Sequence, residues 1–219
     1  CLLERTGSVK KSFADWLNIC KKLKMRYPVV LPEYYQEKKF VNTYVVIDIL
    51  SKLLTHNDVI VPGSSGTCSE ITLQTFKVKE KQRIFNTPGL GSMGFGIPAS
   101  IGACVSSGKR TVCLIGDGGF QHNIQEIELL KRYELPLKIF VLNNNAYASI
   151  RATQNRFFNG NLVGCDASSG LTLPDTMKIA NAYGVKFFRI TNHTNIENKI
   201  AKVLNCKGPV ICELMINPD

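Results

Sequence analysis

Several features typical of membrane, secreted and zinc-containing proteins are missing from this sequence. No apolar run reaches the roughly 18 residues that a membrane-spanning helix needs, and the opening CLLERTGSVKK has no long apolar segment of the secretory type. None of the eight cysteines forms a CxxC pair, and no Cys and His residues have zinc-site spacing. We therefore expect no membrane partner, no disulfide framework and buried free thiols in a reducing, cytoplasmic setting.

Acidic residues are also scarce. Seventeen Asp and Glu residues oppose 27 Lys and Arg residues, which gives a formal net charge of +10. Such an excess can indicate a nucleic-acid or other anionic partner. Much of it lies in the first forty residues, at Lys10, Lys11, Lys21, Lys22, Lys24, Arg26, Lys38 and Lys39. Residues 12–27 have apolar residues at helical spacing, so we expect the lysines to form a solvated helix face and expect no nucleic-acid partner.

Apolar strands and amphipathic helices alternate from about residue 41 onward. Continuous apolar strands separated by helices are typical of a parallel sheet that is covered on both faces. The predicted fold class is therefore α/β, with a three-layer, doubly wound and mainly parallel sheet. Strands are expected at 58–63, 110–116, 137–145, 185–190 and 209–216, and helices at 42–54, 97–107, 123–134, 174–184 and 195–205.

The most informative residues follow two of the predicted strands. Asp117 comes directly after one strand, within GDGGF, and Asn144 follows the next strand within NNNAY. Mg²⁺ prefers oxygen ligands, so the Asp117 carboxylate, the Asn144 amide oxygen and the Ala146 carbonyl would form a suitable set. Gly116 and Gly118 would allow a sharp turn and the approach of a bulky anion, and a helix starting near Gly119 would direct amides at a phosphate. A purely structural alternative is that Asp117 caps the helix and residues 143–145 form a turn.

A second motif could indicate a different ligand. The stretch GLGSMG, residues 89–94, matches the G-x-G-x-x-G pattern of dinucleotide-binding units, and Asp117 follows at a suitable distance. The strand that should precede it, in KQRIFNTP, has only two apolar residues and ends at Pro88. The dinucleotide alternative also leaves the glycines after Asp117 and the NNNA stretch without a role.

The combination of motifs resembles one enzyme family. GDG followed by NN, with Asn144 27 positions after Asp117, resembles the signature of thiamine-diphosphate enzymes. Residues 89–103, GLGSMGFGIPASIGA, and residues 116–145 resemble the acetolactate synthase branch. The resemblance implies that residues 1–40 are the end of a preceding domain and a connector, and that residues 41–219 are the C-terminal domain that binds thiamine diphosphate and Mg²⁺. The start at Cys1 rather than Met also leads us to expect part of a longer protein.

The resemblance assigns roles to matching residues. The implied Mg²⁺ ligands are Asp117, Asn144 and Ala146. The family often has Gln-His where this chain has Thr67-Cys68, and Met93 matches the residue that holds the cofactor in a V shape, although ordinary core packing of a methionine is an alternative. The implied cofactor-binding residues are Ser65, Gly66, Thr67, Cys68, Gly91, Met93, Gly116, Gly118, Gly119, Asn144, Ala146 and Tyr147.

The resemblance also implies an activity. The full-length enzyme would decarboxylate a 2-oxo acid, with pyruvate as the expected donor, and join the resulting enamine to a second carbonyl. The activating glutamate would come from a pyrimidine-binding domain of the same or a partner subunit in a homodimer or homotetramer. We therefore assign no catalytic residue here and expect this chain to be inactive alone; FAD is left undetermined. The alternatives are a 2-oxo-acid decarboxylase of the same superfamily and a non-catalytic basic binding module.

The residues that follow Ala146 suggest a wall or lid over the active site. Tyr147, Ile150 and Gln154 are candidates to face the substrate, with ordinary packing as the alternative. His122 is expected outside the first layer of contacts, and Glu126 and Glu128 on a helix face away from the chemistry.

Overall fold

The fold is built around one parallel sheet. The computed structural model describes residues 13–64 and 66–218. In these residues, six strands follow the order β2-β1-β3-β4-β6-β5, and every neighbouring pair is parallel. The strands are β1 (Val59–Pro62), β2 (Arg83–Ile84), β3 (Thr111–Gly116), β4 (Leu137–Asn143), β5 (Lys186–Ile190) and β6 (Val210–Met215). The predicted α/β class with a doubly wound parallel sheet is confirmed.

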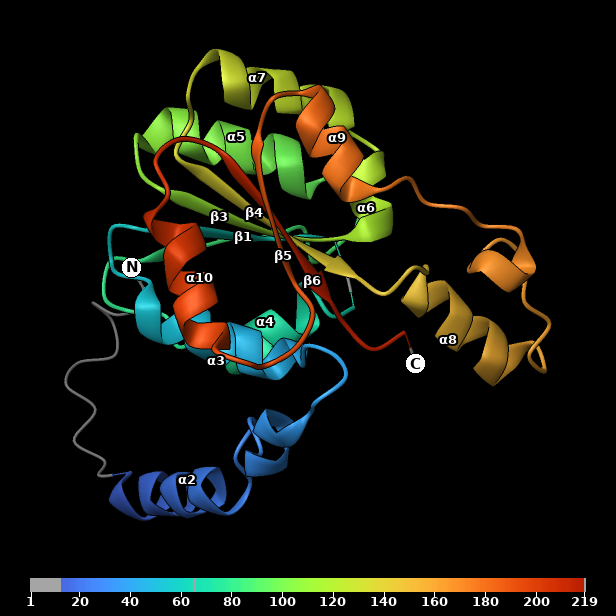
Figure 1. Ribbon diagram of the computed structural model, residues 1–219. Coiled ribbons are helices and arrows are strands. Elements are labelled where there is room, and N and C mark those ends of the chain that lie inside the picture. Colours follow the sequence, from blue (N-terminus) through green and yellow to red (C-terminus); the bar gives the residue numbers. More distant parts are fainter. Residues whose placement is uncertain (1–12, 65, 219) are drawn as a thin grey trace.

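Helices cover both faces of the sheet, as Figure 1 shows. One face carries α3 (Thr43–Leu53), α4 (Glu70–Thr75) and α10 (Ile196–Asn205), and the other carries α5 (Gly96–Ser107), α6 (Asp117–Gln121), α7 (Ile127–Arg132) and α9 (Thr176–Ala182). Alternate residues of the central strand β4 feed two separate cores. Phe140 packs with the α3 and α10 side, whereas Ile139 and Val141 pack with the α5, α7 and α9 side. Burial on both faces explains why the strands read as continuous apolar runs.

Several predicted boundaries need correction. The helix expected at 123–134 is a 3₁₀ turn, η2 (Ile124–Glu126), followed by α7. The helix expected near Gly119 already begins at Asp117. The strand expected to reach residue 145 ends at Asn143, because Asn145 has a left-handed backbone with φ of +54°. The short elements α4 and β2 were not predicted, since neither is long enough to show a hydrophobic period.

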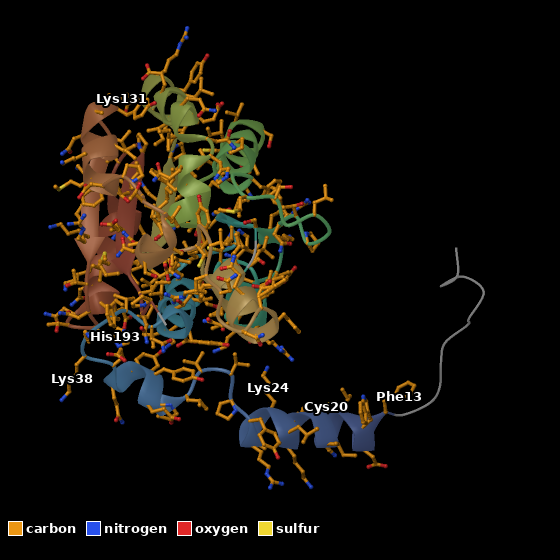
Figure 2. All side chains as sticks on the ribbon, turned by 90° about the vertical axis from the view of Figure 1, so that its right-hand side faces the viewer. Phe13, Cys20, Lys24, Lys38, Lys131 and His193 are labelled. Atoms are coloured by element: carbon orange, nitrogen blue, oxygen red, sulfur yellow. The ribbon has the colours of Figure 1, made fainter. Side chains whose placement is uncertain are left out.

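The N-terminal part lies apart from the sheet. The predicted helix is present as α2 (Ala14–Arg26), but none of its residues is buried, and Trp16 is 61% exposed. Figures 1 and 2 show α2 projecting away from the body of the fold. The segment that follows α2 contains η1 (Pro32–Gln36), where the Tyr35 hydroxyl donates to Asp48 of α3 at 2.7 Å. This segment is therefore attached to α3, whereas every residue of α2 is exposed.

Two further expectations can be compared with the described residues. Seven cysteines lie in this part of the chain, and all are free thiols; Cys68, Cys104, Cys113, Cys165 and Cys212 are buried. The expectation of buried free thiols is confirmed for these residues. Within the same part of the chain, no helix has both the length and the apolar character needed to cross a bilayer.

Candidate functional site

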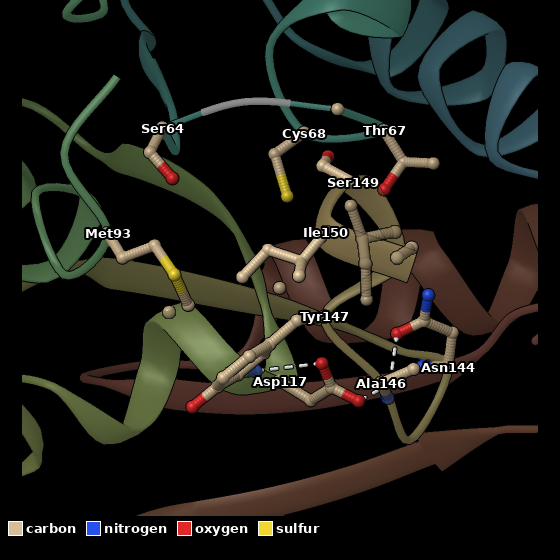
Figure 3. Close-up of a pocket in the computed structure, with 16 residues that line it drawn as sticks. Ser64, Thr67, Cys68, Met93, Asp117, Asn144, Ala146, Tyr147, Ser149 and Ile150 are labelled. Atoms are coloured by element: carbon tan, nitrogen blue, oxygen red, sulfur yellow. Dashed lines mark hydrogen bonds between the residues drawn. The ribbon is translucent and has the colours of Figure 1, made fainter. Parts of the chain in front are cut away.

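Three strand-end loops meet in one pocket. Strands β1, β3 and β4 are consecutive neighbours and all parallel, so their carboxyl ends lie at one edge of the sheet. Ligands of open α/β sheets bind at such edges. Figure 3 shows the pocket, which has a volume of about 130 Å³. It is lined by Ser64, Gly66, Thr67, Cys68, Met93, Gly116, Asp117, Gly118, Gly119, Leu142, Asn144, Ala146, Tyr147, Ala148, Ser149 and Ile150.

Asp117 lies at the centre of this arrangement. Its side chain is buried, and one carboxylate oxygen accepts from the Gly118 amide at 2.7 Å. The other oxygen accepts from the amides of Asn144 and Asn145 at 3.1 and 2.7 Å. Burial raises the pKa of Asp117 to about 6, although these backbone hydrogen bonds oppose the shift. Because burial disfavours the charged form of this carboxylate, a bound cation would stabilise it.

The ligand set predicted for Mg²⁺ is brought together on adjacent loops. The Asp117 carboxylate contacts the backbone of the loop that carries Asn144, and the Asn144 amide oxygen accepts from Ala146 N–H at 3.3 Å. Oxygen donors of this kind suit Mg²⁺, which takes few protein ligands and completes its shell with water and phosphate. No group of three His, Cys, Asp or Glu residues that could hold a metal occurs among the described residues. The donors therefore fit Mg²⁺ better than zinc.

Close packing requires a glycine at position 118. A Cβ atom on Gly118 would overlap the ring of Tyr147 and lie 3.2 Å from Cε of Met93. The Tyr147 ring therefore lies directly against the Gly118 backbone. Since the Gly118 amide already donates to Asp117, one of the two amides predicted to meet a diphosphate is engaged in this structure.

The remaining predicted cofactor-binding residues differ in whether they line the pocket. Thr67, Cys68 and Met93 line the pocket, and Met93 is 37% exposed, which contradicts the alternative of ordinary core packing. Gly91 does not line the pocket. Ser65 lies outside the described residues. Burial raises the pKa of the Cys68 thiol, which therefore presents a neutral thiol where the family often has a histidine.

The segment that follows residues 144–146 is a helix at the mouth of the pocket. It comprises α8 (Ala148–Phe157), and Tyr147 and Ile150 line the pocket as expected. Gln154 does not, because its side chain makes two hydrogen bonds to the backbone of Val163, at 3.0 and 3.1 Å. Sequence reasoning missed Ser64, Leu142, Ala148 and Ser149. Ser64 could have been found as the second residue after β1, but the others carry no distinctive motif.

His122 and the nearby acids occupy the places expected of them. His122 is exposed, and its Nδ1 lies 3.0 Å from the Gly118 carbonyl oxygen, so it contacts the loop from outside. Glu126 and Glu128 do not line the pocket.

The strand order argues against the dinucleotide alternative. A short strand, β2, does precede GLGSMG, and α5 and β3 follow it. In a dinucleotide-binding βαβ unit the two strands are normally neighbours, whereas here β1 lies between β2 and β3. The helix also begins at Gly96, after the glycine motif has ended.

Comparison with known proteins places the chain in a family. Residues 64–214 match the family described as "Thiamine pyrophosphate enzyme, C-terminal TPP binding domain". Similar proteins include the acetolactate synthase large subunit of Cyanidium caldarium, 29% identical over 97% of this chain and 35% of that protein. Chloroplastic acetolactate synthase 2 of Zea mays is 28% identical over 98% of this chain and 34% of that protein.

A solved structure agrees on the fold. The thiamine diphosphate-dependent 4-hydroxybenzoylformate decarboxylase of Rhodococcus jostii RHA1 superposes with a TM-score of 0.73 at 22% identity, covering 84% of this chain and 34% of that one. The chain thus spans about a third of the length of the relatives it matches. It belongs to the thiamine pyrophosphate enzymes, as a C-terminal TPP-binding domain.

Proposed function

We propose that this chain binds the Mg²⁺-diphosphate end of thiamine diphosphate in a longer enzyme that decarboxylates a 2-oxo acid, with pyruvate as donor, and joins the product to a second carbonyl. The observation that carries the proposal is the meeting of the Asp117 and Asn144 loops at the carboxyl ends of β3 and β4. Similarity to acetolactate synthases supports the carboligase activity.

The residues of this chain would hold and orient the cofactor. The Asp117 carboxylate, the Asn144 amide oxygen and the Ala146 carbonyl would bind Mg²⁺, and Gly119, which lines the pocket, would leave room for the diphosphate. Met93, which lines the pocket across from Thr67 in the view of Figure 3, would support the cofactor's bent shape. When bound, thiamine diphosphate supplies the electron sink for decarboxylation.

The chain offers only part of an active site. The pocket volume of about 130 Å³ is smaller than the roughly 300–1,000 Å³ of a complete small-molecule site. Asp117 is the one carboxylate among the residues that line it. A second domain would complete the pocket and supply an acid, so we propose that the chain is inactive alone and acts in a homodimer or homotetramer. The free buried thiols favour a reducing compartment such as the cytoplasm.

Calorimetric titration of the full-length protein with thiamine diphosphate tests this proposal. We expect binding that requires Mg²⁺ and that Asp117→Asn abolishes. Asp48→Asn is the matched control, because Asp48 is a buried carboxylate that pairs with Lys52, away from the pocket. Binding without Mg²⁺, or equal binding by Asp117→Asn, would contradict the proposed metal site.

Product analysis separates the two enzyme activities. A carboligase that acts on two 2-oxo acids releases carbon dioxide and a 2-hydroxy-3-oxo acid, whereas a simple decarboxylase releases carbon dioxide and an aldehyde. Accumulation of aldehyde alone would favour the decarboxylase alternative. Salt-sensitive binding to random DNA that is unchanged by Asp117→Asn would instead favour the basic binding module.

A further inference from the structure

A series of hydrogen-bonded polar side chains leads from β5, at the end of the strand order, to the loop at residues 144–146. Arg189 on β5 lies opposite Glu213 on β6 in the strand register, and its Nε donates to a Glu213 carboxylate oxygen. The other Glu213 oxygen accepts from Nδ2 of Asn143, the last residue of β4, at 2.7 Å. The Asn143 amide oxygen then accepts from Asn145 N–H at 2.9 Å. The same Asn145 amide donates to Asp117 at 2.7 Å, so the series ends on the predicted metal ligand.

The donors and acceptors in this series fix how the Asn143 side chain is oriented. An ionised carboxylate can only accept hydrogen bonds, so Glu213 requires the NH₂ group of Asn143 to face it. The Asn143 oxygen must then face the loop at residues 144–146, where it meets the Asn145 amide. An amide side chain without such a partner could turn by 180° and present NH₂ to another N–H. Glu213 therefore fixes which end of Asn143 reaches the loop.

The loop needs such a restraint. Asn145 has a φ of +54°, in the left-handed region that few residues other than glycine and asparagine adopt. Its amide is held by two acceptors, Asn143 and Asp117. The residues on either side of it, Asn144 and Ala146, are the proposed ligands. A rotation at Asn145 would move both ligand oxygens relative to Asp117.

The burial of Glu213 also calls for an explanation. Its side chain is 1% exposed, whereas its partner Arg189 is 38% exposed and also pairs with Asp175 at 3.6 Å. A buried ion pair of this kind often adds little net stability, because removing two charges from water is costly. A role in fixing local geometry accounts for a carboxylate at this position better than stability does.

We infer that Glu213, acting through Asn143, is a positioning residue that sets the geometry of the metal-binding loop at residues 144–146. The inference rests on the proposed function for its metal. Glu213 touches neither the pocket nor the cofactor; it acts by restraining the backbone that presents Asn144 and Ala146. Residues that orient metal ligands in this way typically change metal affinity about 10–100-fold when they are removed.

Glu213→Gln and Asn143→Ala, with the double variant, test the inference in the full-length protein. Asp58→Asn is the matched control. Asp58 is also a buried carboxylate paired with an arginine, Arg110, but it precedes β1, at the opposite edge of the sheet from the pocket. Two quantities are measured for each variant: Mg²⁺ affinity at saturating thiamine diphosphate, and hydrogen exchange of the Asn145 amide without cofactor.

We expect both single variants to weaken Mg²⁺ binding about 10-fold or more and to accelerate exchange at Asn145. The double variant should be no weaker than the worse single variant, because the two residues act in series. Asp58→Asn should lower the melting temperature yet leave Mg²⁺ affinity within twofold of wild type. Wild-type protein that does not bind Mg²⁺ would overturn the proposed function. Wild-type binding with unchanged affinity and unchanged exchange in Glu213→Gln and Asn143→Ala would overturn the positioning role alone.

Discussion

The contact between Gly118 and Tyr147 allows a sharp prediction. Gly118→Ala places a methyl group where the Tyr147 ring now lies, 2.5 Å from its Cδ1 and 3.2 Å from Cε of Met93. Either the ring or the backbone of α6 must move. Overpacking of this kind typically costs about 1–3 kcal/mol of unfolding free energy, which for a chain of this size is a fall in melting temperature of roughly 2–12 °C.

The neighbouring glycine provides the control. A Cβ on Gly116 would meet only Cys68 Sγ, at the ordinary contact distance of 3.9 Å, and Gly116 has an ordinary φ of −72°. Gly116→Ala should therefore change the melting temperature by less than about 2 °C. Combining Gly118→Ala with Tyr147→Ala should recover much of the lost stability, because the overlapping ring is gone.

Calorimetric melting of Gly116→Ala, Gly118→Ala, Tyr147→Ala and the Gly118→Ala/Tyr147→Ala double variant gives the result. A loss in Gly118→Ala that persists in the Tyr147→Ala background would show that the ring is not the obstacle. Equal losses in Gly116→Ala and Gly118→Ala would refute the assignment of the clash to one position. We also expect Gly118→Ala to weaken Mg²⁺-dependent thiamine diphosphate binding, since a displaced Tyr147 ring would enter the pocket.

Two further predictions concern pH. Burial alone would raise the pKa of Asp58, but hydrogen bonds led by that from Arg110 outweigh it and lower the pKa. The stability contributed by this pair is present above about pH 4 and is lost as pH falls through the lower, folded-state pKa. The melting temperature of Asp58→Asn should therefore fall less steeply below pH 4 than that of wild type. An equally steep fall in both proteins would refute this. Lys138 is buried, which lowers its pKa to about 8. At this residue the unfolded state therefore binds more protons than the folded state between about pH 8 and 10.5, and the contribution of Lys138 to stability should rise with pH in that range. Urea titrations should show that the unfolding free energy of wild type minus that of Lys138→Met increases between about pH 8 and 10.5; a difference that does not change with pH would refute this. The variant also loses the hydrogen bonds to the carbonyls of Cys206 and Gly208, which shifts the difference by a constant amount.

The long elements of the fold could be predicted because burial on both faces leaves a continuous apolar signal. Strands β3, β4 and β6 are covered by helices on two sides, and their sequences are almost uninterrupted apolar runs. Strand β2 pairs through two residues only, Arg83 and Ile84, and both are partly accessible, so no such signal exists there. The helix boundaries at α6 and α7 depend on local turns around Gly118 and Asn123 that propensity alone does not locate.

The site divides in a similar way. Asp117 and Asn144 could be found because polar residues directly after buried strands are conspicuous, and adjacent parallel strands bring them together. The position of the Tyr147 ring against Gly118 could not be predicted, because it depends on a rotamer and a backbone turn. The link from Glu213 to Asn143 was also missed, since 70 residues separate the two and only the strand order places them side by side.

The most direct test of the central claim is a crystal structure of the full-length protein grown with Mg²⁺ and thiamine diphosphate. The account predicts one Mg²⁺ bound by the Asp117 carboxylate, the Asn144 side-chain oxygen and the Ala146 carbonyl, at the roughly 2.0–2.1 Å typical of this ion. The diphosphate of the cofactor should complete the metal's coordination beside Gly118 and Gly119. A cofactor bound with its metal on other residues, or a diphosphate held away from the ends of β3 and β4, would contradict the account.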